Sequence, residues 1–385
     1  MKIVLIADYL PDRSPSMRRY ALMLERILLA RGFAVKRVHP PAVLGSLPLL
    51  PGGVAKWFGY LDKYLIAPFY LRWQCRTADV VHVCDHSASM YLRCAGKAPG
   101  VLTCHDLLAI RGARGLYDGV RVKWTGRMQQ RWIAREIRAA EHIICVSERT
   151  KQDVLELGPA SGTEIRVIHN PLNRNFRQAG EAETARALAG LHLAAGTEYL
   201  FHVGGNKWYK NRLAVLRIFS ELKALPGFAG MKLIMAGDAW TEEMRSFHAV
   251  MPHKDEVLEA GKVSDEDLDA LYSGAAALLF PSREEGFGWP ILEAQACGCP
   301  VITTNRAPMT EVAGDAAIFI DPAQPEAAAR HIAEEWDRRE ALRVAGFRNL
   351  ERFDETHAVA AYCELYAALA RVPDLTAAGG SAKPV

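Results

Sequence analysis

Hydrophobic residues along this chain alternate between short apolar runs and longer amphipathic stretches. In the first half, short runs rich in β-branched residues predict strands at Ile3–Ala7, Val80–Cys84, Val101–Cys104, His142–Val146 and Ile165–Ile168. Periodic stretches between them, such as Met17–Ala30 and Val120–Ala140, predict helices. Strands that alternate with helices are typical of a parallel sheet with helices on both faces.

The same alternation starts again after a polar, Ala/Gly-rich stretch at Gln178–Gly196. Further strands are predicted at Tyr199–Val203, Lys232–Ala236, Ala276–Phe280, Val301–Thr303 and Ala317–Ile320. A chain of 385 residues also exceeds the size of one ordinary core. The sequence therefore predicts an α/β protein with two doubly wound, Rossmann-like domains that face each other across a cleft and bind ligands at the carboxyl ends of their strands.

The pattern also predicts where the chain divides. We expect one domain at 1–175, a linker at 176–196 and a second domain at 197–355. A last helix at 356–372 is expected to pack back on the first domain. The small, polar tail at 373–385 is expected to be disordered.

Composition indicates a globular protein. Half of the residues are hydrophobic and 24% are charged, and no apolar run approaches the length of a membrane-spanning helix. The N-terminal MKIVLIADYLPD reads as a first strand because it lacks the cleavage site of a signal peptide. The eight cysteines are scattered without zinc-like spacing, which favours reduced thiols in the cytoplasm.

Charge is divided unevenly along the chain. Residues 1–176 carry 26 Lys and Arg against 14 Asp and Glu, whereas the whole chain has a net charge of only +3. A helix at Val120–Ala140 places Arg127, Arg131, Arg135 and Arg138 on one face, and Lys56–Trp73 mixes aromatic with basic residues. These segments suit an anionic membrane surface. The alternative is a packed helix with a solvated basic face, and no nucleic-acid recognition module is present.

The most informative segment is PSREEGFGWPILEAQACGCPVI at Pro281–Ile302. A predicted strand leads into a glycine turn and then into a helix at Pro290–Cys297, with Pro290 in its first turn. Glu285 lies on the turn and Glu293 on the helix, eight residues apart. Carboxylates accept paired hydrogen bonds from hydroxyl-rich ligands, and an exposed helix N-terminus attracts phosphate. The alternative interpretation is a capped helix with solvated glutamates.

This segment resembles the Glu-x7-Glu region of retaining glycosyltransferases with the GT-B fold, of the family 4 (group 1) type. The resemblance covers nearly the whole chain and is looser in the first half. It implies that Glu285 contacts hydroxyls of the donor sugar and that Glu293 holds the ribose of the nucleotide. Main-chain N–H groups of Gly286, Phe287 and Gly288 would then face the sugar and the phosphates.

A second signal is FHVGGNKWYKNR at Phe201–Arg212. A predicted strand ends at Gly204–Gly205, and Lys210 lies beside the start of a helix near Asn211, which together suit a diphosphate. Read alone, it is also an ordinary strand–turn–helix, and it does not match the dinucleotide GxGxxG pattern. The Lys210–Asn211 pair matches the family. The family's usual arginine is absent, because Gly205 and Tyr209 hold its positions, which leaves Lys207 or Arg212 as candidates.

The resemblance assigns further residues. His105 and Asp106 follow the strand Val101–Cys104, as a His–Asp pair does in many members, so His105 is expected at the donor sugar and Asp106 at the loop or the acceptor. Val263 is expected to receive the nucleobase through its main chain. The loop at Asp8–Arg19 departs from the family's glycine-rich loop, and Ser14 and Ser16 are its candidates for acceptor or phosphate contacts.

Together these features predict a metal-independent, retaining hexosyltransferase without a cofactor. It would move a sugar from a nucleoside-diphosphate donor of GDP or UDP type, bound by the second domain, to an acceptor hydroxyl at the first. The catalytic set would be His105, Asp106, Lys210 and Glu285. Cell-surface polysaccharide or glycolipid synthesis is the expected setting, with a peripheral place on the inner membrane face as a hypothesis. The alternatives are a sugar-nucleotide epimerase and a catalytically silent nucleotide-sugar sensor.

Overall fold

The computed structural model describes residues 1–12, 14–46 and 52–370, with the side chains of 52–56 left out. The predicted tail at 373–385 therefore lies outside the described residues. The chain forms two compact units. Unit 1 comprises Met1–Asn173 with the C-terminal helix α15 (Glu355–Ala370), and unit 2 comprises Arg174–Asp354.

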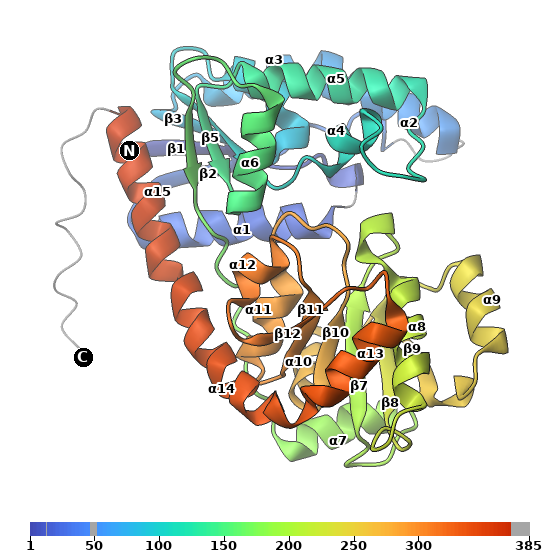
Figure 1. Ribbon diagram of the computed structural model, residues 1–385. Coiled ribbons are helices and arrows are strands. Elements are labelled where there is room, and N and C mark those ends of the chain that lie inside the picture. Colours follow the sequence, from blue (N-terminus) through green and yellow to red (C-terminus); the bar gives the residue numbers. More distant parts are fainter. Residues whose placement is uncertain (13, 47–51, 371–385) are drawn as a thin grey trace, which may run out of the picture. The chain divides into compact units, whose positions relative to one another are not determined.

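Unit 1 is built on a parallel six-stranded sheet in the order β2-β1-β3-β4-β5-β6 (Figure 1). The strands are β1 (Lys2–Ile6), β2 (Ala34–Val38), β3 (Val80–Val83), β4 (Gly100–Cys104), β5 (His142–Cys145) and β6 (Glu164–Val167). Its α-helices are α1 (Pro15–Ala30), α2 (Gly52–Leu61), α3 (Ala67–Cys75), α4 (Leu108–Ala113), α5 (Trp124–Arg138), α6 (Glu148–Leu157) and α15. A π-helical turn, η2 (Asp62–Ile66), joins α2 to α3, and 3-10 helices form η1 (Leu10–Asp12) and η3 (His86–Cys94).

The central strands of unit 1 bury both faces, so alternate residues enter two layers of packing. One layer joins Val4, Val81 and Leu102 to Leu71 of α3 and Ile137 of α5. The opposite layer faces α1 and α15 and contains a buried polar cluster. In it, His82 Nε2 lies 2.7 Å from Thr103 Oγ1, His82 Nδ1 lies 2.5 Å from Tyr366 Oη, and Tyr20 Oη lies 2.7 Å from Tyr362 Oη. These contacts tie α15 to β3 through Tyr366 and to α1 through Tyr362, although both partners lie more than 250 residues earlier in the chain.

Unit 2 repeats the architecture with the order β12-β11-β10-β7-β8-β9, again all parallel (Figure 1). Its strands are β7 (Tyr199–Gly204), β8 (Lys232–Gly237), β9 (Val257–Gly261), β10 (Ala277–Phe280), β11 (Val301–Thr304) and β12 (Ala317–Ile320). Its α-helices are α7 (Glu181–Gly190), α8 (Arg212–Lys223), α9 (Glu242–Val250), α10 (Asp265–Ser273), α11 (Trp289–Ala296), α12 (Met309–Ala313), α13 (Pro325–Glu334) and α14 (Arg339–Leu350). The 3-10 helices are η4 (Trp208–Lys210), η5 (Lys254–Glu256), η6 (Trp336–Arg338) and η7 (Glu351–Phe353).

The prediction of α/β units with parallel sheets is confirmed, and the structure adds elements that the pattern missed. Both β2 and β9 are edge strands. Their burial is incomplete, so their sequences, AVKRV and VLEAG, lack the continuous apolar run of a central strand. The stretch 176–196, predicted as a linker, contains α7, which packs on α10 in unit 2.

Candidate active site

A tight approach of two strands shapes the turn after β7. Gly237, which ends β8, has φ +119°, and a Cβ there would lie 2.0 Å from the Gly204 carbonyl oxygen. Only glycine fits this position. The next residue, Asp238, accepts a hydrogen bond from the Asn206 N–H at 3.1 Å. The turn that follows Gly204–Gly205 is therefore fixed by the neighbouring strand end.

Lys210 and Glu285 meet in this region although 75 residues separate them. Lys210 Nζ lies 2.8 Å from Glu285 Oε1 and 2.9 Å from Glu285 Oε2. The Lys210 side chain is 20% exposed and that of Glu285 is 8% exposed. The sequence assigned Lys210 to a diphosphate and Glu285 to a sugar, and the fold joins the two in one ion pair.

Asn211 explains how Lys210 reaches that place. Its backbone is left-handed, with φ +53°, and it turns the chain from η4 into α8. Its side-chain Nδ2 donates to the Pro281 carbonyl oxygen at 3.0 Å, just after β10. A residue that tolerates the left-handed region and also carries an amide donor suits both tasks. The Lys–Asn pair therefore links the ends of β7 and β10.

Arg212 is buried in the first turn of α8. Its Nη1 donates to Asn206 Oδ1 and to the Asp238 carbonyl oxygen, both at 2.6 Å. Burial lowers the pKa of its guanidinium, while Asp238 and Glu259 oppose that shift. Arg212 thus holds the turn from inside, whereas Lys207 is exposed.

Glu293 lies on α11 and is buried. Tyr272 Oη, from α10, donates to Glu293 Oε2 at 3.0 Å. Burial and the adjacent carboxylate raise the pKa of Tyr272, so the phenol keeps its proton and remains a donor. Sequence analysis missed Tyr272, because a tyrosine in the apolar pattern of α10 carries no signal for a partner 21 residues away.

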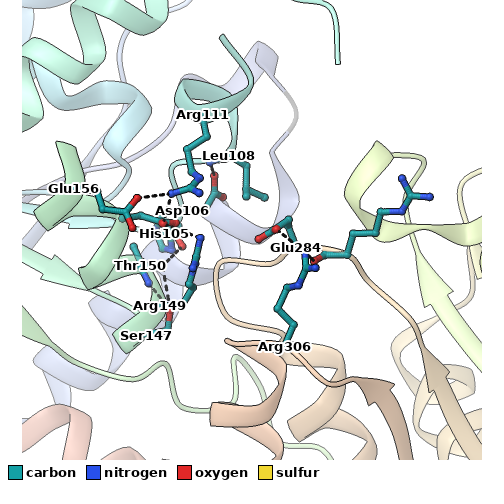
Figure 2. A network of polar contacts seen from close by, with 12 residues as sticks. His105, Asp106, Leu108, Arg111, Ser147, Arg149, Thr150, Glu156, Glu284 and Arg306 are labelled. Atoms are coloured by element: carbon teal, nitrogen blue, oxygen red, sulfur yellow. Dashed lines mark hydrogen bonds and ion pairs between the residues drawn. The ribbon is translucent and has the colours of Figure 1, made fainter. Parts of the chain in front are cut away.

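The helix that carries Glu293 begins where the sequence predicted a phosphate-facing turn. Gly288 caps α11 with φ +109°, and Pro290 lies in its first turn. Phe287 is buried, and its ring lies 5.8 Å from that of Phe353. Glu284, one residue before Glu285, pairs with Arg306 at 3.0 Å (Figure 2). The observed helix starts one residue before the predicted Pro290–Cys297 and ends one residue earlier.

Val263 lies between the end of β9 and the start of α10. Gly261 has φ +64°, and the Ser264 hydroxyl accepts the Asp267 N–H at 3.0 Å as the cap of α10. Val263 is half-buried. Its main chain thus belongs to a short, sharply turned segment.

In unit 1, His105 directly follows β4 and is buried. Its Nε2 lies 2.8 Å from the Cys84 carbonyl oxygen, which can only accept, so Nε2 carries the proton. Burial lowers the pKa of His105, although Asp85 opposes that shift, and the ring is neutral with its lone pair on Nδ1. The Tyr20 ring meets it edge-on at 4.6 Å. Thr150 Oγ1 donates to the His105 carbonyl oxygen at 3.1 Å, and Figure 2 shows this contact.

Asp106 and the serines have more local surroundings. Asp106 Oδ1 accepts the Leu108 N–H at 3.0 Å, which orients the loop before α4 (Figure 2). Ser14 and Ser16 were predicted on a loop extending to Arg19, but α1 begins at Pro15, so Ser14 is its cap position and Ser16 is in its first turn. The loop prediction is wrong beyond Ser14, because Pro15 suits the first turn of a helix.

The structure therefore brings the predicted residues into two groups. In unit 2, Lys210, Asn211 and Glu285 meet at the ends of β7 and β10, and Glu293 is held nearby along α11 by Tyr272. In unit 1, His105 and Asp106 follow β4. Within the described ranges, no cluster of His, Cys, Asp or Glu has the arrangement of a metal site.

Comparison with known proteins gives two family matches. The model of "Glycosyl transferases group 1" matches residues 189–345, and that of "Glycosyltransferase Family 4" matches residues 17–176. The O-antigen chain mannosyltransferase B of Escherichia coli is 29% identical over 212 residues, which are 54% of this chain and 55% of that protein. The chain thus spans about half the length of the curated relatives that it matches.

Solved structures show the same fold. Sucrose-phosphate synthase from Thermosynechococcus elongatus superposes with a TM-score of 0.73 at 20% identity, covering 96% of this chain and 99% of that one. Anabaena HepE in complex with UDP and glucose superposes with a TM-score of 0.72 at 15% identity, covering 96% of this chain and 100% of that one. With its two Rossmann-like units and a family match on each, the chain belongs to the family 4, group 1 glycosyltransferases of the GT-B fold.

Proposed function

We propose that the protein transfers a hexose from a nucleoside-diphosphate sugar to an acceptor hydroxyl, with retention of the anomeric configuration and without a metal ion. The observation that carries this proposal is the Lys210–Glu285 pair at the ends of β7 and β10. A cation and a carboxylate held together beside the starts of α8 and α11 suit a ligand that is anionic at one end and rich in hydroxyls at the other. Glu293 would accept the ribose hydroxyls and Val263 the base.

In the proposed reaction, the bond between the anomeric carbon and the diphosphate oxygen breaks, and a bond from the same carbon to the acceptor oxygen forms on the same face. The acceptor proton passes to the departing diphosphate. Negative charge grows on that leaving group, and Lys210 with the main-chain N–H groups of Gly286–Gly288 would stabilise it. Glu285 would hold sugar hydroxyls and keep Lys210 in place. Arg212 would act as a positioning residue for the turn.

For unit 1, the proposal assigns His105 to a sugar hydroxyl through its Nδ1 lone pair and Asp106 to the shape of the adjoining loop. The 2.8 Å bond from His105 Nε2 to the Cys84 carbonyl fixes the tautomer that this role needs. Ser14 and Ser16 would contact the acceptor. The names of the relatives favour cell-surface polysaccharide or glycolipid synthesis with mannose as one candidate sugar, and HepE, solved with UDP-glucose, favours a UDP-sugar. The donor nucleotide would be of GDP or UDP type.

The test begins with a thermal-shift screen of GDP-, UDP- and dTDP-sugars, because a ligand that binds only the folded state raises its stability. The donor that stabilises the protein is then supplied with acceptor sugars, and the anomeric configuration of the product is read by NMR. A chelator should leave turnover unchanged. Donor isomerisation without an acceptor would establish the epimerase instead. Binding without transfer or hydrolysis would establish the silent sensor.

We also propose that unit 1 docks on an anionic membrane surface. A line of exposed apolar side chains runs along α2, η2 and α3 at four-residue spacing: Trp57, Leu61, Leu65, Phe69 and Trp73. Phe69 is 75% exposed and Trp57 is 67% exposed. Large aromatic side chains with neighbouring cations are typical of proteins that lie in the lipid interface. No helix in the described part of the chain has the length and apolarity to cross a bilayer.

Vesicle co-sedimentation tests this second proposal. The wild type should bind vesicles that contain phosphatidylglycerol and ignore vesicles of phosphatidylcholine. Replacing Phe69 and Trp73 by Ser should weaken binding, whereas Ser at the exposed Leu155 and Val344 removes apolar surface elsewhere and should not. Equal binding by all variants would refute the proposed surface.

A further inference from the structure

A cavity of about 520 Å³ lies between α4 and α5 of unit 1, and none of the proposed donor residues lines it. Four arginines line it, together with Gln130 and a small apolar floor. The lining residues are Arg114, Arg127, Arg131, Arg138, Gln130, Ile110, Ala113 and Ala134. Such a volume is in the range of small-molecule sites. The cavity therefore combines room for a ligand with one sign of charge.

The four guanidinium groups have no acidic partner in the part of the chain that the structure describes. Neighbouring arginines differ in this respect. Arg111, on α4, pairs with Asp153 and Glu156, at 2.7 and 2.8 Å. Arg93 pairs with Glu136 at 2.6 Å. All four arginines of the cavity are thus unpaired among the described residues, whereas Arg111 and Arg93 nearby are held by carboxylates.

The sequence of α5 makes this charge costly. Glu136 is the only acidic residue of the helix, and both Arg93 and the Trp132 indole N–H already occupy it. Arg127 and Arg131 are four residues apart, as are Arg131 and Arg135, and like charges at this spacing destabilise a helix. A bound anion would remove this repulsion.

We propose that this cavity binds a phosphate or diphosphate ester. Guanidinium groups donate paired hydrogen bonds that match phosphate oxygens, and several converging arginines select a multiply charged anion over a single carboxylate. The apolar floor of Ile110, Ala113 and Ala134 suits the carbon atoms next to the ester. The ligand is either a soluble phosphate ester or the phosphate of a lipid in the adjoining membrane. The site stands apart from the proposed sugar transfer, because none of its residues belongs to the donor group.

The experiment measures binding of inorganic diphosphate by calorimetry to the full chain carrying Lys210→Ala, so that the proposed donor site does not contribute. In that background, the cavity pair of substitutions, Arg127→Gln with Arg131→Gln, should lower the affinity for diphosphate at least about tenfold, as expected when two charge-assisted contacts are lost. The matched control, Arg121→Gln with Arg135→Gln, removes the same charge from exposed positions outside the cavity. It should change affinity by less than about twofold. Melting temperatures confirm that both pairs fold.

Vesicles distinguish the two sources of phosphate. If the cavity pair also loses binding to phosphatidylglycerol vesicles while the control pair keeps it, the site binds lipid phosphate. If the Arg127→Gln, Arg131→Gln variant loses diphosphate binding but still binds the vesicles, the site binds a soluble phosphate ester. If diphosphate binds equally to the cavity pair and to the control pair, or does not bind, the proposal is overturned. None of these outcomes depends on sugar transfer, which is assayed separately with Lys210 intact.

Discussion

Replacing Lys210 by Ala tests the proposed site with two separate readouts. Lys210 would face the diphosphate as it departs, and loss of one such stabilising contact costs about 2.7–4 kcal/mol in the transition state, or 10²–10³ in kcat. The same change leaves the Glu285 carboxylate, 8% exposed, without its cation. Removing one partner of a fully buried ion pair lowers the stability of a protein by ~3–5 kcal/mol. Because Lys210 is 20% exposed, we expect the free energy of unfolding to fall by about 1–3 kcal/mol and the melting temperature by roughly 5 °C.

A second variant separates these effects. Adding Glu285→Gln to Lys210→Ala removes the uncompensated charge, so stability should recover by at least about 1 kcal/mol, whereas turnover should stay low. Turnover is measured by release of the nucleoside diphosphate and stability by urea unfolding. Wild-type turnover in Lys210→Ala would refute the diphosphate role. A double variant no more stable than the single one would refute the energetic account of the pair.

Two further changes probe the buried polar contacts. Tyr272→Phe removes the hydrogen bond to Glu293, so it should cost about 1–3 kcal/mol of stability and raise the KM for the donor, whereas Tyr366→Phe, in the α15 cluster of unit 1, should cost stability alone. Burial lowers the pKa of both His82 and His202 to about 3, below their unfolded value near 6.5. Between pH 6.5 and pH 3 only the unfolded chain binds protons at these histidines, so their contribution to stability is complete above pH 6.5 and is lost as the pH falls. The free energy of unfolding should fall by up to about 1.4 kcal/mol per pH unit for each histidine. The free energy of unfolding is measured with urea between pH 6.5 and 5. It should depend less steeply on pH in His82→Gln than in the exposed-site control His357→Gln, and equal slopes would count against this account of His82.

The fold could be predicted largely from local patterns. Central strands such as β4 and β10 are buried on both faces, so their sequences are continuous apolar runs that stand out from the amphipathic helices. The edge strands β2 and β9 escaped prediction because water covers part of their surface and their sequences read as ordinary mixed segments. The helix in the predicted linker escaped for a related reason, since an Ala-rich, polar stretch is compatible with either state.

For the candidate site too, some features could be predicted from the sequence and others depended on the tertiary structure. Sequence by itself determined which side chains are the candidates for the chemistry: Glu285, Lys210 and His105 lie just beyond strands and Glu293 lies on the helix that follows, near the sheet edge where parallel sheets collect their functional groups. Only the tertiary structure decided their partners. The Lys210–Glu285 pair, the Tyr272–Glu293 bond and the unpaired arginines between α4 and α5 join residues from different elements. The physical reason is that hydrogen bonds and ion pairs act over a few ångströms in space, whereas periodicity reports only a residue's immediate neighbours in the chain.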